Sequence, residues 1–296
     1  MKPNDSAGKL GFGCWILAAI SVLAAPAELR VPLTAAGGEV NDRVILADIN
    51  RHTARLMEAN ATVRCADMLR VPQPKQCKLE LRAAGREKIT AAETLRRSRA
   101  GVLIISNYYK CNRCPNWHSG VASGFMLTAD GAFCTSYHVL ENQANETLVI
   151  VTGDGRVAPV VELLAADPVA DLVILRAAGK GFTPLPVAAA VEAGDKIRVL
   201  SHPDSQFYVF SEGIVSRRFV DIRPAGQRSM LAITADFAKG SSGAPVFDET
   251  GAVVASVNNT RSTYYNTTDK GVNDNLQMVF KNCVSTRHLL EMVRGK

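Results

Sequence analysis

From residue 101 onward the chain is built of short apolar runs separated by turn-forming residues, and this pattern limits the fold more than any other feature. Such runs are typical of β-strands, and pairs such as Asp130-Gly131 are typical of the hairpins between them. A crossover at Pro184 and Pro186 separates two sets of six runs: Val102–Ser106, Gly124–Leu127, Ala132–Ser136, Leu148–Val151, Val157–Leu164 and Leu172–Arg176, then Lys196–Ser201, Tyr208–Ser216, Leu231–Thr234, Ala244–Asp248, Val253–Val257 and Gln277–Asn282. The sequence therefore predicts an all-β fold of two six-stranded antiparallel barrels.

Helical patterns flank this strand-rich part. Residues 285–294 carry apolar side chains at helical spacing and predict a closing C-terminal helix. Upstream, apolar residues recur at near-helical spacing from about Asn41, and the pattern breaks near Asn60. A Thr-x-x-Glu capping box at 90–93 opens a further short helix. Residues 28–105 are therefore expected to form a small helical N-terminal extension, which could be a pro-segment, a partner-binding arm or a packing layer.

The first 27 residues resemble a secretory signal peptide. Lys2 and Lys9 precede an uncharged apolar stretch, which ends in the small-x-small pattern of residues 25–27. Cleavage there predicts a secreted or periplasmic protein with no stable membrane span, whereas an uncleaved segment would remain as an anchor. The expected organisation is thus a signal peptide (1–27), the extension (28–105), the first barrel (106–185), and the second barrel with the closing helix (186–296).

Positive charge is concentrated before the strand-rich part. The chain has 296 residues and a net charge of +6, of which residues 28–100 contribute +5 and residues 101–296 contribute none. A basic balance can indicate nucleic acid or an anionic membrane as a partner, but basic helices more often carry such charge on a solvated face. No nucleic-acid partner is therefore expected.

Six cysteines follow the expected cleavage site: Cys65, Cys77, Cys111, Cys114, Cys134 and Cys283. An even number in an exported chain suggests three disulfides, for which 15 connectivities are possible. A bridge between Cys65 and Cys77 would connect a helix end to the returning chain. Cys111-Asn112-Arg113-Cys114 could instead be a redox motif or, with His118, half of a zinc site, but no second Cys/His pair is near. Structural bridging is the favoured interpretation.

The chemistry of the chain points to Ser242, in Lys239-Gly240-Ser241-Ser242-Gly243. A serine is a poor nucleophile unless a base takes its proton and hydrogen-bond donors stabilise the oxyanion that it creates. The backbone N–H groups of Gly240 and Ser242 could supply those donors. Taken alone, the stretch could equally be a Ser/Gly-rich hairpin loop.

Two upstream stretches favour the catalytic interpretation. His138 follows a predicted strand, and Asp171 opens the apolar run Leu172–Leu175. The order His, Asp, Ser is one of the known orders of a catalytic triad. Asp167 is a rival for Asp171, although an aspartate before a proline often bonds its own backbone. Ser241 is the local rival for Ser242.

At these residues the chain resembles trypsin-like serine proteases, and most closely the bacterial HtrA/Deg-type branch. The resemblance covers about residues 120–296 and is carried by SGFMLTADGAFCTSYHVL, LLAADPVADLVILR, EGIVS and GSSGAPVFDETGAVVAS. It implies the two-barrel fold with its site in the cleft between barrels. It also implies that His138 is the general base, Asp171 its orienting carboxylate and Ser242 the nucleophile. No room is expected for the PDZ domain that HtrA relatives carry.

The resemblance also suggests a substrate pocket. Ser256, Val257 and Asn258 match the strand that lines the primary pocket, and counting back six residues from Ser242 places Asp236 at the base. An aspartate there would favour Arg or Lys substrates, whereas HtrA-like relatives prefer small apolar residues. Ser241 stands where digestive trypsins have the aspartate that receives the newly cut N-terminus, which puts trypsin-style zymogen activation in doubt.

The sequence thus predicts an exported serine endopeptidase that acts on proteins or peptides through an acyl-enzyme, with no metal or organic cofactor. One alternative is a catalytically inactive protease-fold protein that binds partners through its basic N-terminal arm. Another is a redox or metal protein built on Cys111 and Cys114. The sequence does not predict the oligomeric state.

Overall fold

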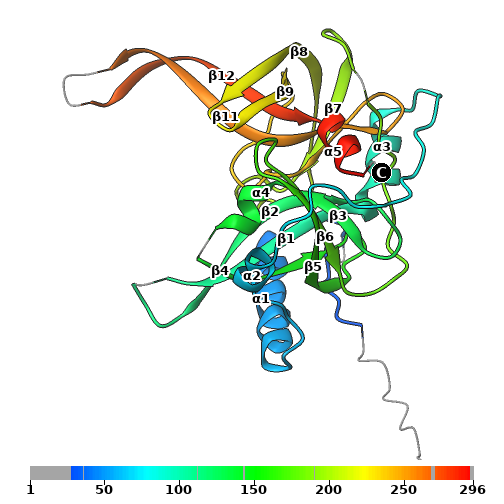
Figure 1. Ribbon diagram of the computed structural model, residues 1–296, viewed down its shortest axis with the longest axis vertical. Helices are drawn as coiled ribbons and strands as arrows, with labels where there is room; N and C mark the ends of the chain where they lie inside the picture. The colour runs from blue at the N-terminus through cyan, green and yellow to red at the C-terminus, as the bar shows by residue number, and fades with distance from the viewer. Residues whose placement is uncertain are drawn as a thin grey trace, which may run out of the picture.

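The computed structural model describes residues 28–35, 37–111, 113–142, 144–189, 191–267 and 271–293 (Figure 1). The expected signal peptide lies outside these residues. Two antiparallel barrels form the body of the molecule, as the sequence predicts, and a short C-terminal helix follows them. In the described part of the chain, no helix is both long enough and apolar enough to cross a membrane.

The first barrel is closed in the strand order β1-β2-β3-β6-β5-β4. All six predicted runs lie on or overlap its strands, and a short helix, α4, follows β3. The elements are β1 (Val102–Lys110), β2 (Trp117–Met126), β3 (Ala132–Thr135), α4 (Tyr137–Glu141), β4 (Asn145–Val151), β5 (Val157–Asp167) and β6 (Leu172–Ala177). Because β1 begins at Val102, this barrel starts inside the range expected for the extension.

The second barrel is closed in the order β10-β11-β12-β9-β8-β7. Its strands are β7 (Lys196–Ser201), β8 (Val209–Arg223), β9 (Gly226–Ile233), β10 (Pro245–Phe247), β11 (Val253–Thr267) and β12 (Asn273–Ser285). A 3₁₀ turn, η2 (Pro203–Ser205), follows β7, and helix α5 (Thr286–Val293) follows β12. Helix α5 contacts β5 of the first barrel and β9, β11 and β12 of the second, so it closes the junction between them.

Three helices and a 3₁₀ turn precede the barrels: α1 (Asp42–Glu58), α2 (Cys65–Arg70), α3 (Ala91–Ser98) and η1 (Arg99–Gly101). The predicted helix starts are confirmed. The Asn41 side chain accepts from Val44 N–H at 3.2 Å, and Thr90 Oγ1 accepts from Glu93 N–H at 3.2 Å. Asn60 takes a φ of 53°, at the predicted break after α1.

The extension lies against both barrels. Ala166 N–H in β5 donates to Pro74 O at 2.8 Å, and Arg198 in β7 donates to Thr94 Oγ1 at 2.7 Å. The extension also contacts the C-terminal helix, where Cys77 N–H donates to Met292 O in α5 at 2.8 Å. These contacts show that the extension packs on both barrels.

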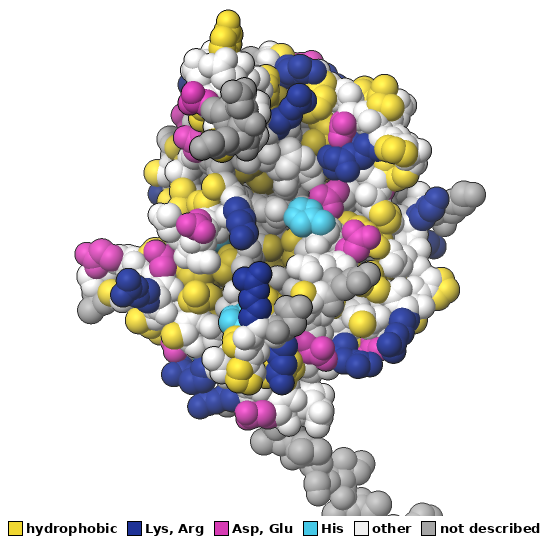
Figure 2. All heavy atoms as spheres, turned by 90° about the vertical axis from the view of Figure 1, so that its left-hand side faces the viewer, with side chains coloured by type: hydrophobic (Ala, Val, Ile, Leu, Met, Phe, Trp, Pro, Cys, Tyr) yellow, Lys and Arg dark blue, Asp and Glu magenta, His cyan; other side chains and the backbone are white. Residues whose placement is uncertain are grey.

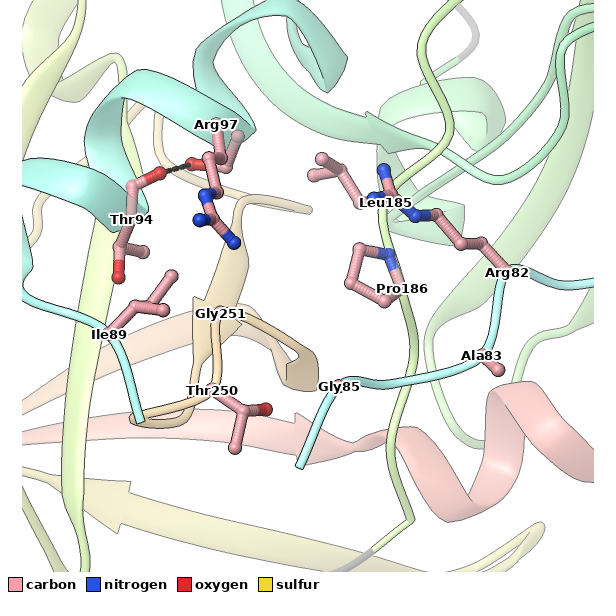
Figure 3. Close-up of a pocket in the computed structure, with 11 residues that line it drawn as sticks. Arg82, Ala83, Gly85, Ile89, Thr94, Arg97, Leu185, Pro186, Thr250 and Gly251 are labelled. Carbon is pink, nitrogen blue, oxygen red and sulfur yellow. Dashed lines mark hydrogen bonds between the residues drawn. The ribbon is translucent and has the colours of Figure 1, made fainter. Parts of the chain in front are cut away.

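A cavity of about 110 Å³ lies where this extension meets the barrels. Figure 3 shows its walls: segment 82–89 and α3 of the extension, Leu185 and Pro186 of the inter-barrel connection, and the turn at Thr250 and Gly251. Its two arginines are already engaged. Arg97 pairs with Glu93, and Arg82 donates to Pro184 O at 3.3 Å. The cavity is therefore a packing seam away from Ser242.

Positive and negative side chains alternate on the face shown in Figure 2, with hydrophobic side chains between them. The net charge of +6 is thus not gathered into one basic patch on this face.

The structure shows no disulfide among the described residues, and the six cysteines there are all free. Cys65, Cys134 and Cys283 are buried in three different hydrophobic clusters, so these three do not bridge to one another. Cys77 packs against the cluster of Cys134, so it does not bridge to Cys65. Cys111 and Cys114 lie together at the surface, with their sulfurs 3.5 Å apart as separate thiols.

Candidate active site

The loop between β9 and β10, residues 234–244, carries Ser242 and is here called the nucleophile loop. Each backbone carbonyl from residue 238 to residue 242 accepts a hydrogen bond. The pairs are Ser241 N to Ala238 O (3.0 Å), Asp204 N to Lys239 O (2.6 Å), Ser123 Oγ to Gly240 O (3.0 Å), Ala244 N to Ser241 O (2.9 Å) and Ser123 N to Ser242 O (2.9 Å). The loop is therefore held in one conformation before any substrate arrives.

Two glycines in this loop are required by its shape. Gly240 has a φ of 96° and Gly243 a φ of 85°, in the region that side chains other than glycine rarely adopt. A Cβ on Gly240 would lie 2.6 Å from His202 O, and one on Gly243 would lie 2.3 Å from Ser123 O. The nucleophile loop thus packs too closely for any side chain at both glycines, against the chain just after β7 at Gly240 and against β2 of the other barrel at Gly243.

The fixed carbonyls also set where the N–H groups point. The C=O and N–H of a trans peptide point in opposite directions. Since Lys239 O points at Asp204 N–H, the N–H of Gly240 points away from that turn. Gly240 and Ser242 line the same cavity as His138. No intramolecular acceptor is present for either N–H within the described ranges. This arrangement fits the expected oxyanion-binding pair.

His138 and Asp171 lie on two short connections of the first barrel. His138 is in α4, directly after β3, and Asp171 ends the turn between β5 and β6. His138 Nδ1 lies 2.8 Å from Asp171 Oδ2, and His138 N–H donates to Asp171 Oδ1 at 2.9 Å. On the other side of the ring, Nε2 lies 3.1 Å from Ser242 Oγ. With a proton on Nδ1 held by the carboxylate, Nε2 is free to accept the serine proton.

Both rivals have other partners. Asp167 Oδ1 accepts from the N–H groups of Val169 and Ala170 at 3.0 and 2.9 Å, which is the backbone-bonding role expected of a turn aspartate. Ser241 is fully buried, and its Oγ bonds to Ser201 Oγ at 3.0 Å. The structure therefore brings His138, Asp171 and Ser242 together and leaves the rivals outside.

Two cavities adjoin Ser242. One of about 160 Å³ lies beside His138 and is walled by Asn107, Val121 and Ala122 of β1 and β2. The other, of about 110 Å³, is lined by Phe237, Ala238, Lys239, Val257, Asn258, Asn259 and Thr260. The second includes Val257 and Asn258, which the sequence assigns to the substrate pocket, and its lining mixes apolar and polar side chains.

Two of the expected pocket residues are not in it. Asp236 does not lie at a pocket base: its side chain is 88% exposed and pairs with Lys281 at 3.1 Å. Counting back from Ser242 fails because the intervening chain turns Phe237, and not Asp236, toward the cavity. Ser256 lies in β11 opposite Pro245 with its Oγ buried, so of the three pocket residues expected on that strand only Val257 and Asn258 line the pocket.

A network behind Asp171 was missed by the sequence reasoning. Asn258 Nδ2 donates to Asp171 Oδ2 at 2.5 Å, and Asn258 Oδ1 accepts from Arg228 at 3.1 Å. Arg228 is 1% exposed, and its Nε also donates to Asp221 at 3.0 Å. No pattern in the sequence marks Arg228, because a basic residue in a strand normally suggests a solvated edge. Its role depends on long-range strand register.

No metal-ligand set lies beside Ser242 in the described part of the chain. Among the described residues, the one group of three or more potential ligands is Cys111, Cys114 and His118, which lies on the hairpin between β1 and β2.

Part of the chain is similar in sequence to known serine proteases. Residues 122–255 match the family model of the trypsin-like peptidase domain. A "Probable periplasmic serine endoprotease DegP-like" of Brucella suis biovar 1 (strain 1330) is 32% identical over 136 residues, which are 45% of this chain and 26% of the relative. The "Magnetosome formation protease MamE" of Paramagnetospirillum magneticum (strain ATCC 700264 / AMB-1) is 30% identical over 142 residues, 45% of this chain and 19% of that protein. The matched segment thus spans about a quarter or less of these curated relatives.

Solved structures support the fold. The HtrA-type protease AlgW with a decapeptide aligns with a TM-score of 0.55 at 16% identity, covering 70% of this chain and 67% of that one. AlgW with a tripeptide gives a TM-score of 0.53 at 18% identity, covering 69% and 62%. At such identity the likeness concerns the fold alone.

Proposed function

We propose that this chain, which carries a trypsin-like serine protease domain of the HtrA type, is an endopeptidase that cleaves peptide bonds through Ser242. The observation that carries the proposal is the position of His138, with Nδ1 2.8 Å from Asp171 and Nε2 3.1 Å from Ser242 Oγ. Distances of about 2.6–3.2 Å are those expected between a nucleophile, its base and the group that orients the base.

The geometry supports a two-step mechanism. Ser242 Oγ attacks the substrate carbonyl while His138 Nε2 takes the serine proton, and Asp171 stabilises the resulting imidazolium. The N–H groups of Gly240 and Ser242 receive the oxyanion. His138 then gives its proton to the leaving amine, and an acyl-enzyme on Ser242 remains. Water, deprotonated by His138, releases the product and restores the serine.

A fluorophosphonate probe tests this proposal directly, because it reacts only with an activated serine. We expect one label per chain, on Ser242, and none in Ser242→Ala. Peptide cleavage should fall about 10⁴-fold or more in Ser242→Ala, with little further loss when His138→Ala is added, because the triad acts as a unit. Ser241→Ala is the matched control and should keep its label. If the protein has no label and no cleavage activity, the alternative of a binding protein holds instead.

We further propose that the pocket selects small apolar residues. Its lining includes Phe237, Ala238 and Val257, whereas the Asp236 carboxylate faces solvent beside Lys281. A guanidinium entering this pocket would meet no buried carboxylate, which is costly for a charged group. We therefore expect kcat/KM for substrates with Val or Ala before the scissile bond to exceed that for Arg at least about tenfold. Asp236→Ser should leave this ratio unchanged, and a strong fall in Arg cleavage in that variant would contradict the assignment.

Periplasmic or secreted action is part of the proposal. The supporting observations are the name of the curated relatives and the signal-like residues 1–27.

A further inference from the structure

Two thiols and an imidazole meet at the hairpin that joins β1 to β2. His118 Nε2 lies 3.2 Å from Cys111 Sγ and 3.1 Å from Cys114 Sγ, and the two sulfurs are 3.5 Å apart. The short distances show that the three ligand atoms face one another. The side chains are half-buried, so these atoms remain reachable from solvent. None of them belongs to the proposed catalytic machinery.

These distances are close to those of a metal-binding face. With Zn–S bonds of about 2.3 Å and Zn–N bonds of about 2.0–2.1 Å, tetrahedral coordination places the ligand atoms about 3.5–3.8 Å apart. The three observed separations of 3.1–3.5 Å require only a few tenths of an ångström of expansion to admit an ion. Two cysteines and a histidine are also the ligand types that Zn²⁺ takes in proteins.

The hairpin holds the ligands in this arrangement. His118 lies opposite Tyr109 in the strand register, and Trp117 lies opposite Lys110, so the ladder is paired up to the residue before Cys111. Beside the cluster, the rings of Tyr108 and Trp117 stack with centroids 5.0 Å apart, and the Lys110 ammonium lies 4.9 Å above the Trp117 ring. The two strands thus fix Cys111 and His118 relative to each other, which reduces the entropy cost of binding an ion.

We propose that Cys111, Cys114 and His118 bind one Zn²⁺ ion, with water in the fourth position. Binding replaces the thiol protons, which leave to solvent, and joins the two ends of the β1–β2 connection through the metal. From His118, three further residues of β2 reach Val121 in the wall of the His138 cavity, a path of about 10 Å. The ion would therefore hold the two ends of the hairpin together near the cavity beside His138, and it takes no part in the reaction at Ser242.

The test uses the full chain, purified with a phosphine reductant, freed of metal with a chelator and then titrated with Zn²⁺ or Co²⁺. We expect one ion per chain by elemental analysis, and Co²⁺ should produce the thiolate-to-cobalt charge-transfer absorption. Cys114→Ser and His118→Asn should each weaken Zn²⁺ binding at least about a hundredfold, since even changes outside the ligand shell cost about 10–100-fold. Affinity is measured by competition with a chelating dye.

Cys77→Ser is the matched control, because it removes a half-buried thiol away from the cluster and should leave affinity and stoichiometry unchanged. Melting temperature and near-ultraviolet circular dichroism check that each variant folds, so the result does not depend on protease activity. The proposal fails if protein with all thiols reduced takes up no Zn²⁺, or if Cys77→Ser loses as much affinity as Cys114→Ser. It also fails if Cys111 and Cys114 form a disulfide that persists in the presence of zinc.

Discussion

The two barrels share one strand order but differ in the length of their strands. Read from its first strand, each barrel has the order first, second, third, sixth, fifth, fourth. In the first barrel no strand exceeds the 11 residues of β5, whereas β8 and β11 have 15 each and β12 has 13. The long β11–β12 hairpin leaves the second barrel as an arm (Figure 1), with Tyr265 76% exposed near its tip.

The two barrels also carry different residues of the candidate active site. The compact first barrel supplies His138 and Asp171 from short connections, and helices α1 and α2 pack on its strands β5 and β4. The second barrel supplies Ser242 from a longer loop. The site therefore depends on the seam between the barrels, where Ser123 of β2 bonds to the nucleophile loop and Asn258 of β11 bonds to Asp171.

The largest effect on this seam is expected from Gly243→Ala. The new Cβ would lie 2.3 Å from Ser123 O in the other barrel, so the nucleophile loop would have to move away from β2. Combined with the φ of 85°, this should cost about 3 kcal/mol or more of unfolding free energy and abolish labelling of Ser242. Denaturant unfolding and probe labelling measure the two effects.

Gly194→Ala provides the control. Gly194 has a similar φ of 96° but open space around its Cβ position, so it should lose only about 1–2 kcal/mol and remain fully labelled. Equal losses in the two variants would mean that backbone strain, and not the inter-barrel contact, dominates.

Lowering the pH is expected to have an intermediate effect, a loss of unfolding free energy through His202 in the second barrel. His202, at the end of β7, is fully buried; burial lowers its pKa to about 3, and its Nδ1 accepts from Tyr208 N–H at 3.1 Å. The unfolded chain takes up a proton below about pH 6.5, whereas the folded chain does not until about pH 3. Stability should therefore fall as the pH is lowered through this window, by about 2–3 kcal/mol between pH 6 and pH 4.

His202→Asn isolates that contribution, because its side-chain oxygen can replace Nδ1 as the acceptor from Tyr208. The difference in unfolding free energy between the wild type and this variant should change by the same amount over the same pH range. A pH-independent difference would show that His202 is not the titrating group.

The smallest effect is expected from Arg228→Met, which tests the support of Asp171. Without the guanidinium, Asn258 Oδ1 and Asp221 each lose a buried partner, and Asn258 holds the Asp171 carboxylate less firmly. We expect kcat to fall about tenfold to thirtyfold, with KM nearly unchanged, since Arg228 lines neither cavity beside Ser242.

Arg223→Met is the matched control. Arg223 also bonds to Asp221, at 3.0 Å, but is 46% exposed at the side chain and has no bond to Asn258. Its kcat should remain within about twofold of the wild type. A similar fall in both variants would assign the effect to Asp221 and not to the Arg228–Asn258–Asp171 network.

The sequence predicted what depends on local pattern. All twelve runs lie on or overlap the twelve strands, and β7 matches residue for residue. The motif order also identified the three side chains that the structure brings into hydrogen-bond contact, although their catalytic roles stay predictions. The five-residue helix α4 was missed, because so short a segment shows no periodicity.

What failed depends on distant parts of the chain. Strands β8, β11 and β12 extend beyond their apolar runs into solvent-exposed residues, both polar and apolar (Ile222 and Tyr265 among them), where alternation with a buried face is absent. Asp236 was misplaced because register in a loop cannot be counted from the sequence. The three expected disulfides are not found, because an even number of cysteines does not show which sulfurs meet, and the buried Cys65, Cys134 and Cys283 lie in separate clusters.

The contact between the extension and α5 has a consequence for how the chain folds. The side chain of Gln76 donates to Glu291 O, 215 positions later. Because contacts of such separation close very long loops, they form late and slow the final step of folding. The extension is synthesised before the barrels but cannot complete its docking until residues 286–293 have been synthesised, so we expect the docking of the extension to be the last folding phase.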